Sequence, residues 1–333
     1  MILVILNILV FFILYFLFVN FSVKIKLIDK ANVRKKHIGE VPLIGGFLIL
    51  ISFLFIYLYS ENNIYNHRFN LILYSSLIVF FLGFIDDYKD ISPYIRIIFQ
   101  LIAVMIVING GLSITNLGDL PLNNYFNLYS NIFTILCVLL LINAYNFIDG
   151  ADGICASNFL FSLTSIIIYL FFNNYLIFEK FLFLNYLILS VFLFFIINIS
   201  VLPLKKIFLG DAGSTWLGYL LAWILIYISE IRIINPVLAI WFIALPSFDF
   251  FRLIIKRSIN LKSPFLPDRL HLHHLIQNYT ENNLINILII LILNILLLFI
   301  GIMTTNYFND SISLAAFIIL FILYYIFTIL MEK

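Results

Sequence analysis

Long apolar segments separated by short polar loops dominate the hydrophobic pattern of this chain. A transmembrane helix needs roughly 20 apolar residues, within a range of about 17–25. About eleven segments approach or reach this length, and we predict that each forms a membrane-spanning helix. The fourth and fifth are short and are expected to be tilted or partly covered by neighbouring helices. The segments are Ile2–Val23, Leu43–Ser60, Phe69–Ile85, Ile97–Gly111, Asn131–Tyr145, Ser157–Phe172, Phe181–Ile199, Ser214–Ser229, Asn235–Phe251, Leu284–Thr304 and Ser313–Leu330.

The Lys and Arg residues are distributed unequally between the two sets of loops. If successive segments cross the bilayer in alternating directions, sixteen of the 19 basic residues share one side. Only Arg68, Lys180 and Arg232 fall on the other side. Because Lys and Arg are enriched in cytoplasmic loops, this asymmetry predicts an N-terminus outside and a C-terminus in the cytoplasm.

The composition agrees with a membrane protein. The hydrophobic fraction is 64%, the charged fraction is 11% and the mean hydropathy is +1.12. A soluble protein has about a quarter of its residues charged, so this chain could not cover a soluble core. The segment Met1–Asn20 lacks a basic start and a cleavage site, so we expect an uncleaved first span. No repeat or linker is visible, which predicts one domain over residues 1–333, with its motifs between about 30 and 280.

The loop Asn143–Gly153 concentrates polar residues between two apolar segments. Asn146, Asp149 and Asp152 fall within seven residues of one another. A turn between helices is one explanation, since Asp-Gly pairs favour turns. A site for Mg²⁺ is the other, because this ion takes oxygen ligands and is completed by water and substrate phosphates.

Two further acidic motifs lie on the same predicted cytoplasmic side. Asp86 and Asp87 end the third segment, where they are either a solvated loop start or a carboxylate pair that binds metal or accepts a proton. Asp211 precedes a helix, where it could equally be a cap. Phe208 lies one turn earlier. It could be an anchor at the membrane–water boundary or an aromatic ring on which a base stacks.

Basic and histidine residues complete this side of the chain. Lys36 stands in a basic loop before Gly45-Gly46 and could hold phosphate or simply anchor the loop at the membrane. Asp249, in the ninth segment, is a functional candidate or a partner of Arg252. A cluster near residue 270 is expected to contact anions rather than zinc, because no cysteine accompanies it. A contact with lipid headgroups is the alternative. The members of this cluster are Arg269, His271, His273 and His274.

Together these motifs resemble a known family, the polyprenyl-phosphate N-acetylhexosamine-1-phosphate transferases, which include the MraY translocases. The His-Leu-His-His pattern at residues 271–274 and the eleven spans are more similar to the WecA-like branch than to the MraY branch. The matching motifs follow the expected order, and they are Arg34–Gly46, Phe81–Gly83 with Asp86-Asp87, Asn143–Gly153, Phe208–Ser214 and Ser263–His274.

The resemblance implies a reaction at the cytoplasmic face of a bacterial inner membrane. Hexosamine-1-phosphate, most simply N-acetylglucosamine-1-phosphate, would pass from a UDP-N-acetylhexosamine to a polyprenyl phosphate such as undecaprenyl phosphate, with release of UMP. The product would serve cell-surface polysaccharide synthesis. The MraY substrate and other UDP-sugars stay open, as does a homodimer. A transporter is the alternative of another class, although its polar groups would lie near the bilayer midplane. No nucleic acid is expected as a partner.

The resemblance also implies roles for single residues. Asp211 and Asn146 would hold Mg²⁺, or Mn²⁺ in its place, and the ion would stabilise the departing UMP. Asp86 and Asp87 would accept the proton of the lipid phosphate or place that phosphate. The remaining residues would bind the nucleotide, diphosphate or sugar, with Phe208 stacking on uracil, and they are Asp149, Asp152, Phe208, Arg269, His271, His273 and His274. Asn198 is similar to an asparagine near the nucleotide.

Overall fold

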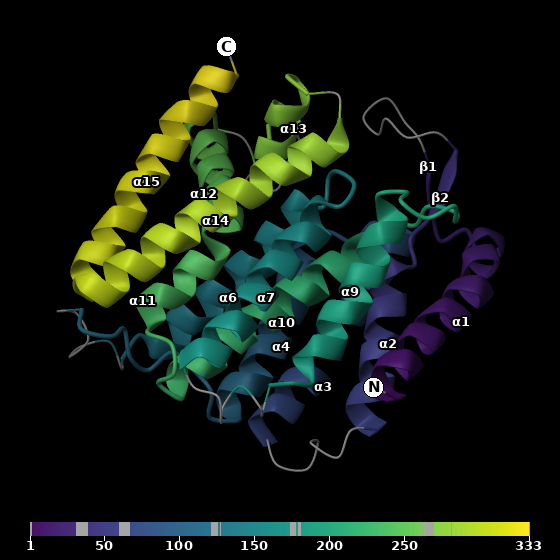
Figure 1. Cartoon of the computed structure of the whole chain (residues 1–333), viewed down its shortest axis with the longest axis horizontal. Helices are drawn as coiled ribbons and strands as arrows, with labels where there is room; N and C mark the ends of the chain where they lie inside the picture. The colour runs from purple at the N-terminus through teal and green to yellow at the C-terminus, as the bar shows by residue number, and fades with distance from the viewer. Residues whose placement is uncertain are drawn as a thin grey trace.

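The computed structural model describes residues 2–30, 39–59, 67–120, 126, 128–173, 178, 181–261, 263, 270–280 and 282–332. Within these ranges the chain forms helices, loops and one two-stranded ribbon (Figure 1). The principal helices are α1 (Ile2–Lys24), α2 (Gly45–Tyr59), α3 (His67–Lys89), α4 (Pro93–Asn109), α6 (Ser130–Ile148), α7 (Ile154–Asn173), α9 (Leu184–Asn198), α10 (Gly210–Glu230), α12 (Ala244–Ile259), α14 (Asn283–Tyr307) and α15 (Asp310–Met331). The shorter ones are α11 (Pro236–Ala239), the 3-10 turn η2 (Ile240–Ile243) and α13 (Leu272–Gln277).

Every predicted segment coincides with a helix. In the described part of the chain, eight helical units have the length and hydropathy needed to cross a membrane, counting α11, η2 and α12 as one unit. The helices α2, α4 and α9 are apolar but shorter. The fifth segment is longer than expected, because α6 extends it at both ends to Ser130–Ile148. The chain is therefore an all-helical, multi-pass membrane protein.

Helix α10 forms the centre of the helix bundle. Of its most apolar residues 94% are buried, against 6% for α15, which faces outward. Helices α2, α3, α6 and α7 pack around α10. A helix that is apolar on all sides is stable only when other helices or lipid surround it. The first turn of α10, which carries Asp211, is consequently fixed by its neighbours on several sides.

The helix ends divide between two sides of the bundle. Helices α3, α6 and α12 end on the side where α2, α7, α10 and α14 begin, so the polar motifs lie together there. Figure 1 shows α13, the ribbon and the C-terminus on this side, away from the N-terminus. We call it the motif side.

The ninth segment is a broken helix rather than a continuous one. The 3-10 turn η2 separates α11 from α12, which begins at Ala244. Pro246 consequently lies in the first turn of α12, where the missing N–H group of proline costs no helical hydrogen bond. Asp249 and Arg252 lie further along α12, where both side chains are buried.

A short ribbon forms in a part of the chain for which no strand is predicted. Strands β1 (Ile28–Lys30) and β2 (Glu40–Pro42) pair in antiparallel fashion, and Leu43 then forms a bridge with Phe208. The sequence also suggests that residues 113–116 could form a small external hairpin. This prediction is wrong, since residues 112–120 contain no strand. Thr115 instead donates two hydrogen bonds, of 2.7 and 2.9 Å, to the carboxylate of Glu230.

Glycines allow the first turn of α10 to touch two neighbouring helices by backbone. A Cβ at Gly46 of α2 would lie 2.5 Å from the Cα of Gly213. A Cβ at Gly83 of α3 would lie 2.6 Å from the Cα of Ala212. Small residues permit this close approach of membrane helices.

We predict that Gly46→Ala lowers the melting temperature in detergent, because the added methyl group meets rigid backbone. Overpacking of this kind typically costs about 1–3 kcal/mol. Gly110→Ala is the matched control, since the nearest atom to its Cβ is the mobile Cδ1 of Leu71, at 2.3 Å. Equal melting temperatures for the two variants would contradict the backbone contact.

Candidate active site

The carboxylate of Asp87 caps the N-terminus of α10. Its two oxygens accept hydrogen bonds from the backbone N–H groups of Asp211, at 2.7 Å, and Ala212, at 3.1 Å. The first N–H groups of a helix lack partners within the helix and carry its positive dipole end. Gly210 has a φ of +77°, and a Cβ there would lie 2.5 Å from Asp87 Oδ2. The cap therefore requires glycine at this position and fixes the backbone of Asp211.

The side chain of Asp211 lies between α6 and α4. Asn146 Nδ2 donates to Asp211 Oδ1 at 2.9 Å and lies 3.2 Å from Ser214 Oγ. Arg96 Nη1 lies 3.5 Å from Asp211 Oδ2. The Asp211 side chain is 38% exposed. It is thus held in place and also open to a ligand.

Asp86 is buried, unlike Asp211. Its Oδ2 lies 2.7 Å from Arg96 Nη1, and its Oδ1 accepts the backbone N–H of Ile91 at 2.6 Å. The side chain is only 2% exposed, whereas Arg96 is 30% exposed. Asp86 therefore holds the guanidinium of Arg96 beside Asp211. Arg96 is therefore a cationic member of the site.

The two acids of the loop after α6 have different environments. Burial raises the pKa of Asp149 well above its usual range, and the negative charges of Asp211, Asp87 and Asp152 raise it further. Asp152 forms an ion pair with Lys206. Ionisation of Asp149 consequently costs folding free energy, whereas the Asp152 carboxylate has a cationic partner.

Asn198 connects this loop to the segment before α10. It is buried, and its Oδ1 accepts the backbone N–H of Gly153 at 2.6 Å. Its Nδ2 donates to the carbonyl of Ile207 at 2.8 Å. The Asn198 side chain thus joins two motifs by hydrogen bonds to their backbones. Its similarity to a nucleotide-binding residue did not indicate this structural role.

The segment 205–209 is held against the start of α2. Phe208 accepts the N–H of Gly45 at 2.9 Å and donates its own N–H to Pro42 at 2.8 Å. The ammonium of Lys206 lies 5.3 Å from the centre of the Phe208 ring. The hydroxyl of Tyr15, on α1, donates to the carbonyl of Lys205 at 2.8 Å. The apolar residues that surround Tyr15 in the sequence did not indicate this contact.

The histidines lie together at the start of α13. His271 Nδ1 is 2.8 Å from Asp249 Oδ2, and His274 Nδ1 is 3.2 Å from Gln277 Oε1. His273 is buried, and burial lowers its pKa well below the usual range, with a further decrease from His274 and His271. The pairing of Asp249 with Arg252, expected as one alternative, is confirmed by a 3.0 Å contact.

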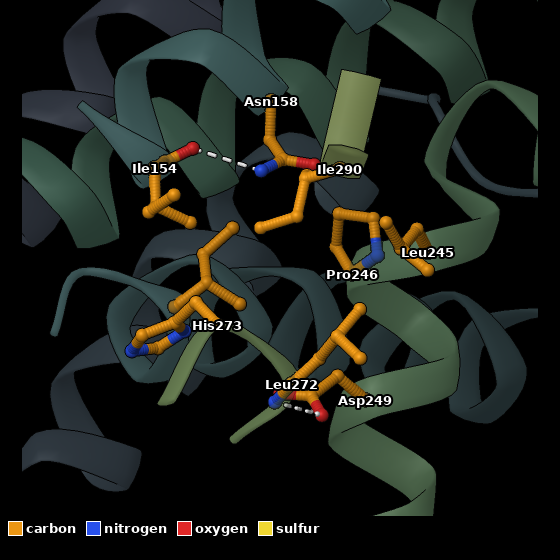
Figure 2. A pocket seen from close by; sticks show the side chains of 9 residues that line it. Ile154, Asn158, Leu245, Pro246, Asp249, Leu272, His273 and Ile290 are labelled. Atoms are coloured by element: carbon orange, nitrogen blue, oxygen red, sulfur yellow. Dashed lines mark hydrogen bonds between the residues drawn. The ribbon is translucent and has the colours of Figure 1, made fainter. Parts of the chain in front are cut away.

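The loop after α6 packs directly on the histidines. A Cβ at Gly150 would lie 2.8 Å from His273 Nε2. Beneath the ring a cavity of about 20 Å³ is lined by residues that include Asn158, Asp249 and His273 (Figure 2). This volume suits a single water molecule rather than a substrate. The acidic motifs and the histidines therefore form one continuous surface on the motif side. Lys36 and Arg269 lie outside the described residues.

The donors of this surface suit magnesium better than zinc. Among the described residues, no three His, Cys, Asp or Glu side chains are arranged as a metal cage. The ring nitrogen Nδ1 of His271 is occupied by Asp249. Mg²⁺ needs only one or two protein carboxylates, because water and substrate phosphates complete its shell. The exposed carboxylate of Asp211 beside the amide of Asn146 fits that requirement.

Fold and site together define a multi-pass membrane protein with an acidic, cation-compatible site at one end of its helices. The glycosyl transferase family 4 profile matches residues 69–229, which include Asp86, Asn146 and Asp211. The similar proteins include undecaprenyl-phosphate alpha-N-acetylglucosaminyl 1-phosphate transferases. That of Yersinia pestis is 32% identical over 93% of this chain and 86% of the relative. That of Haemophilus influenzae is 32% identical over 90% of this chain and 86% of the relative.

A third relative of the same name, from Shigella flexneri, is 29% identical over 90% of this chain and 83% of its own length. The similarity therefore extends well beyond the segment that the family profile matches. The chain belongs to glycosyl transferase family 4 and is a sugar-phosphate transferase.

We predict that Asp149→Asn raises the melting temperature of the metal-free protein at pH 8. The raised pKa means that ionisation of Asp149 costs stability. This cost is absent below the ordinary pKa of aspartate and grows as the pH rises toward the raised pKa. The stabilisation should therefore fade as the pH falls toward about 4.

Thermal unfolding in detergent with a chelator measures this effect. Asp152→Asn is the control, because it removes a carboxylate that is paired with Lys206 and should not stabilise. Adding Mg²⁺ should reduce the advantage of Asp149→Asn by screening the repulsion. A lower melting temperature for Asp149→Asn at pH 8 would refute the electrostatic cost.

Proposed function

We propose that the protein transfers N-acetylglucosamine-1-phosphate from UDP-N-acetylglucosamine to undecaprenyl phosphate. The observation that carries this proposal is the gathering of Asp86, Asp87, Asn146 and Asp211 at one end of the helix bundle. The names of the relatives support the choice of sugar and lipid. The product is a lipid-diphosphate-linked sugar, suited to cell-surface polysaccharide synthesis.

In the proposed reaction, an oxygen of the lipid phosphate attacks the sugar-bearing phosphorus of the UDP-sugar. A new phosphorus–oxygen bond forms, the bond to the UMP oxygen breaks, and UMP leaves with that electron pair. The bond between the sugar and its phosphate stays intact. Because a phosphate monoester is itself a competent nucleophile, catalysis needs mainly positioning and neutralisation of charge.

The contacts of Asp211, Asp87 and Asp86 suggest a role for each. Asp211, with Asn146, holds Mg²⁺ or Mn²⁺, which when bound neutralises diphosphate charge. Asp87 positions Asp211 through the backbone of α10, and Asp86 positions Arg96 to contact phosphate. The other proposed substrate contacts keep their expected roles at the nucleotide, diphosphate and sugar, and they are Asp149, Asp152, Phe208, His271, His273, His274, Arg269 and Lys36.

We also propose that the protein crosses a bacterial inner membrane eleven times, with its N-terminus outside. The side of the bundle that carries the motifs then faces the cytoplasm, where UDP-sugars are made. The excess of Lys and Arg on this side supports the orientation. The shorter helices α2, α4 and α9 are needed for the count of eleven.

We predict that the purified protein, with Mg²⁺, undecaprenyl phosphate and labelled UDP-N-acetylglucosamine, forms a labelled lipid and releases UMP in equal amounts. Unlabelled UDP-sugars added in competition identify the preferred donor. A complete absence of both products would refute the proposed function. Stronger competition from a UDP-N-acetylmuramoyl peptide would assign the substrate of the alternative branch instead.

We predict that Asp211→Asn lowers turnover by at least about 100-fold, because the neutral amide no longer supplies a negative charge for the cation. The variant should fold, since Asp87 still caps α10 through backbone N–H groups. Asp119→Asn is the matched control, being the same change in an exposed acid away from the site. Near-normal turnover of Asp211→Asn at saturating Mg²⁺ would remove Asp211 from the metal site.

A further inference from the structure

The buried carboxylate of Asp249 is the centre of a polar network inside the protein. Its Oδ1 accepts hydrogen bonds from Arg252 Nη2 at 3.0 Å, the backbone N–H of Leu272 at 3.0 Å and the Tyr324 hydroxyl at 2.9 Å. Its Oδ2 faces His271 Nδ1 at 2.8 Å. The Asp249 side chain is only 4% exposed. Buried carboxylates are tolerated only when hydrogen bonds satisfy them in this way.

Part of this network comes from the C-terminal helix α15. Tyr324, Thr328 and Glu332 are spaced four residues apart, so they project from one face of this helix or its end. Tyr324 donates to Asp249, and Glu332 Oε1 accepts Arg252 Nη1 at 3.0 Å. Glu332 also pairs with Lys256. A helix with few fully buried residues thus turns one polar stripe toward α12.

The contact between Asp249 and His271 determines the state of the imidazole. A carboxylate accepts hydrogen bonds, so Nδ1 of His271 must carry the proton. In the neutral ring, Nε2 is then left as the acceptor, and in the charged ring it is a second donor. Carboxylates fix the tautomer and orientation of functional histidines in other proteins by this arrangement. Contacts with the rings of Phe147 and His273, at centroid distances of 5.8 and 5.5 Å, also restrain the His271 ring.

The two oxygens of Asp249 are not supported equally. Oδ1 has three donors, whereas Oδ2 contacts His271. The donors at Oδ1 therefore decide the rotation of the carboxylate, and this rotation decides where Oδ2 meets His271. Arg252 can donate to Oδ1 only while its guanidinium stays in place. Glu332 and the carbonyl of Leu270 hold that guanidinium in place.

We propose that Tyr324 and Glu332 are positioning residues for the transfer reaction, which act through Asp249 and Arg252 on His271. They keep the proton of His271 on Nδ1 and turn Nε2 toward the diphosphate. This inference rests on the proposed function only for the identity of the ligand. The groups that face His271 or its partners are Asp249, Arg252 and Lys256 from α12, Tyr324 and Glu332 from α15, and His273 and His274 from α13.

The test compares Tyr324→Phe with Tyr325→Phe, the same change one residue along α15. The protein contains five histidines, so ¹⁵N-histidine labelling gives a simple spectrum. His271→Gln identifies the His271 signals. We expect one tautomer, with the proton on Nδ1, in the unmodified protein and in Tyr325→Phe. Tyr324→Phe should show a mixture of tautomers, because Oδ1 loses one of its three donors and the carboxylate is held less firmly.

Kinetics on the same variants provide the second readout. We expect Tyr324→Phe to lower kcat about 10-fold, with an unchanged KM for undecaprenyl phosphate, because that lipid does not contact α15 in the proposed role. Tyr325→Phe should resemble the unmodified protein. Glu332→Gln should reproduce the effect of Tyr324→Phe in weaker form, and Glu332→Asp should restore part of the rate. Glu332→Gln also replaces Tyr324→Phe should the latter fail to fold.

Two results would overturn the inference. One is a His271 spectrum that is the same in Tyr324→Phe and Tyr325→Phe. The other is an equal loss of rate and melting temperature in both variants, which would indicate general loosening of α15. If the unmodified protein makes no lipid-linked product and yet the spectrum responds to Tyr324→Phe, the network stands and the proposed function fails.

Discussion

The hydrogen bonds between Asp87 and the start of α10 determine the geometry of the whole site. They join the end of α3 to the beginning of the most buried helix, at 2.7 and 3.1 Å. The arrangement requires the left-handed backbone of Gly210, and it holds Asp211 where Asn146 and Arg96 can contact it. The backbone contacts of Gly46 and Gly83 with the same turn leave α10 no room to shift. A rigid support of this kind suits a reaction that depends on the placement of charges.

Helices that face the lipid also contribute to the site, although they lie at the edge of the bundle. Tyr15 of α1 binds the carbonyl of Lys205, next to the segment that carries Phe208. Tyr324 of α15 binds Asp249, which in turn binds His271. In each case a tyrosine hydroxyl of a lipid-facing helix donates a hydrogen bond to an acceptor of the site. Because an unsatisfied acceptor in an apolar interior is costly, these contacts couple the outer helices to the site.

The sequence predicted the helices well and the contacts within the site less well. Segments such as Ser157–Phe172 were found because membrane helices must be long and apolar, which a single sequence records directly. The ribbon of β1 and β2 was missed, and the hairpin near residue 113 was wrong, because short strands depend on tertiary partners. Likewise, Asp87 was found as an acid, but its role as a cap depends on α10, which lies over a hundred residues away.

The balance of charge at the site supports the proposal that a cation binds there. Arg96 neutralises Asp86, Lys206 neutralises Asp152 and Arg252 neutralises Asp249. Asp211 lies 3.5 Å from Arg96, and burial, together with the negative charges of its acidic neighbours, raises the pKa of Asp149. A diphosphate approaching this surface would add negative charge to negative charge. We infer that a divalent cation bound by Asp211 would convert this repulsion into attraction, so that the acidic side chains select the substrate together with its metal.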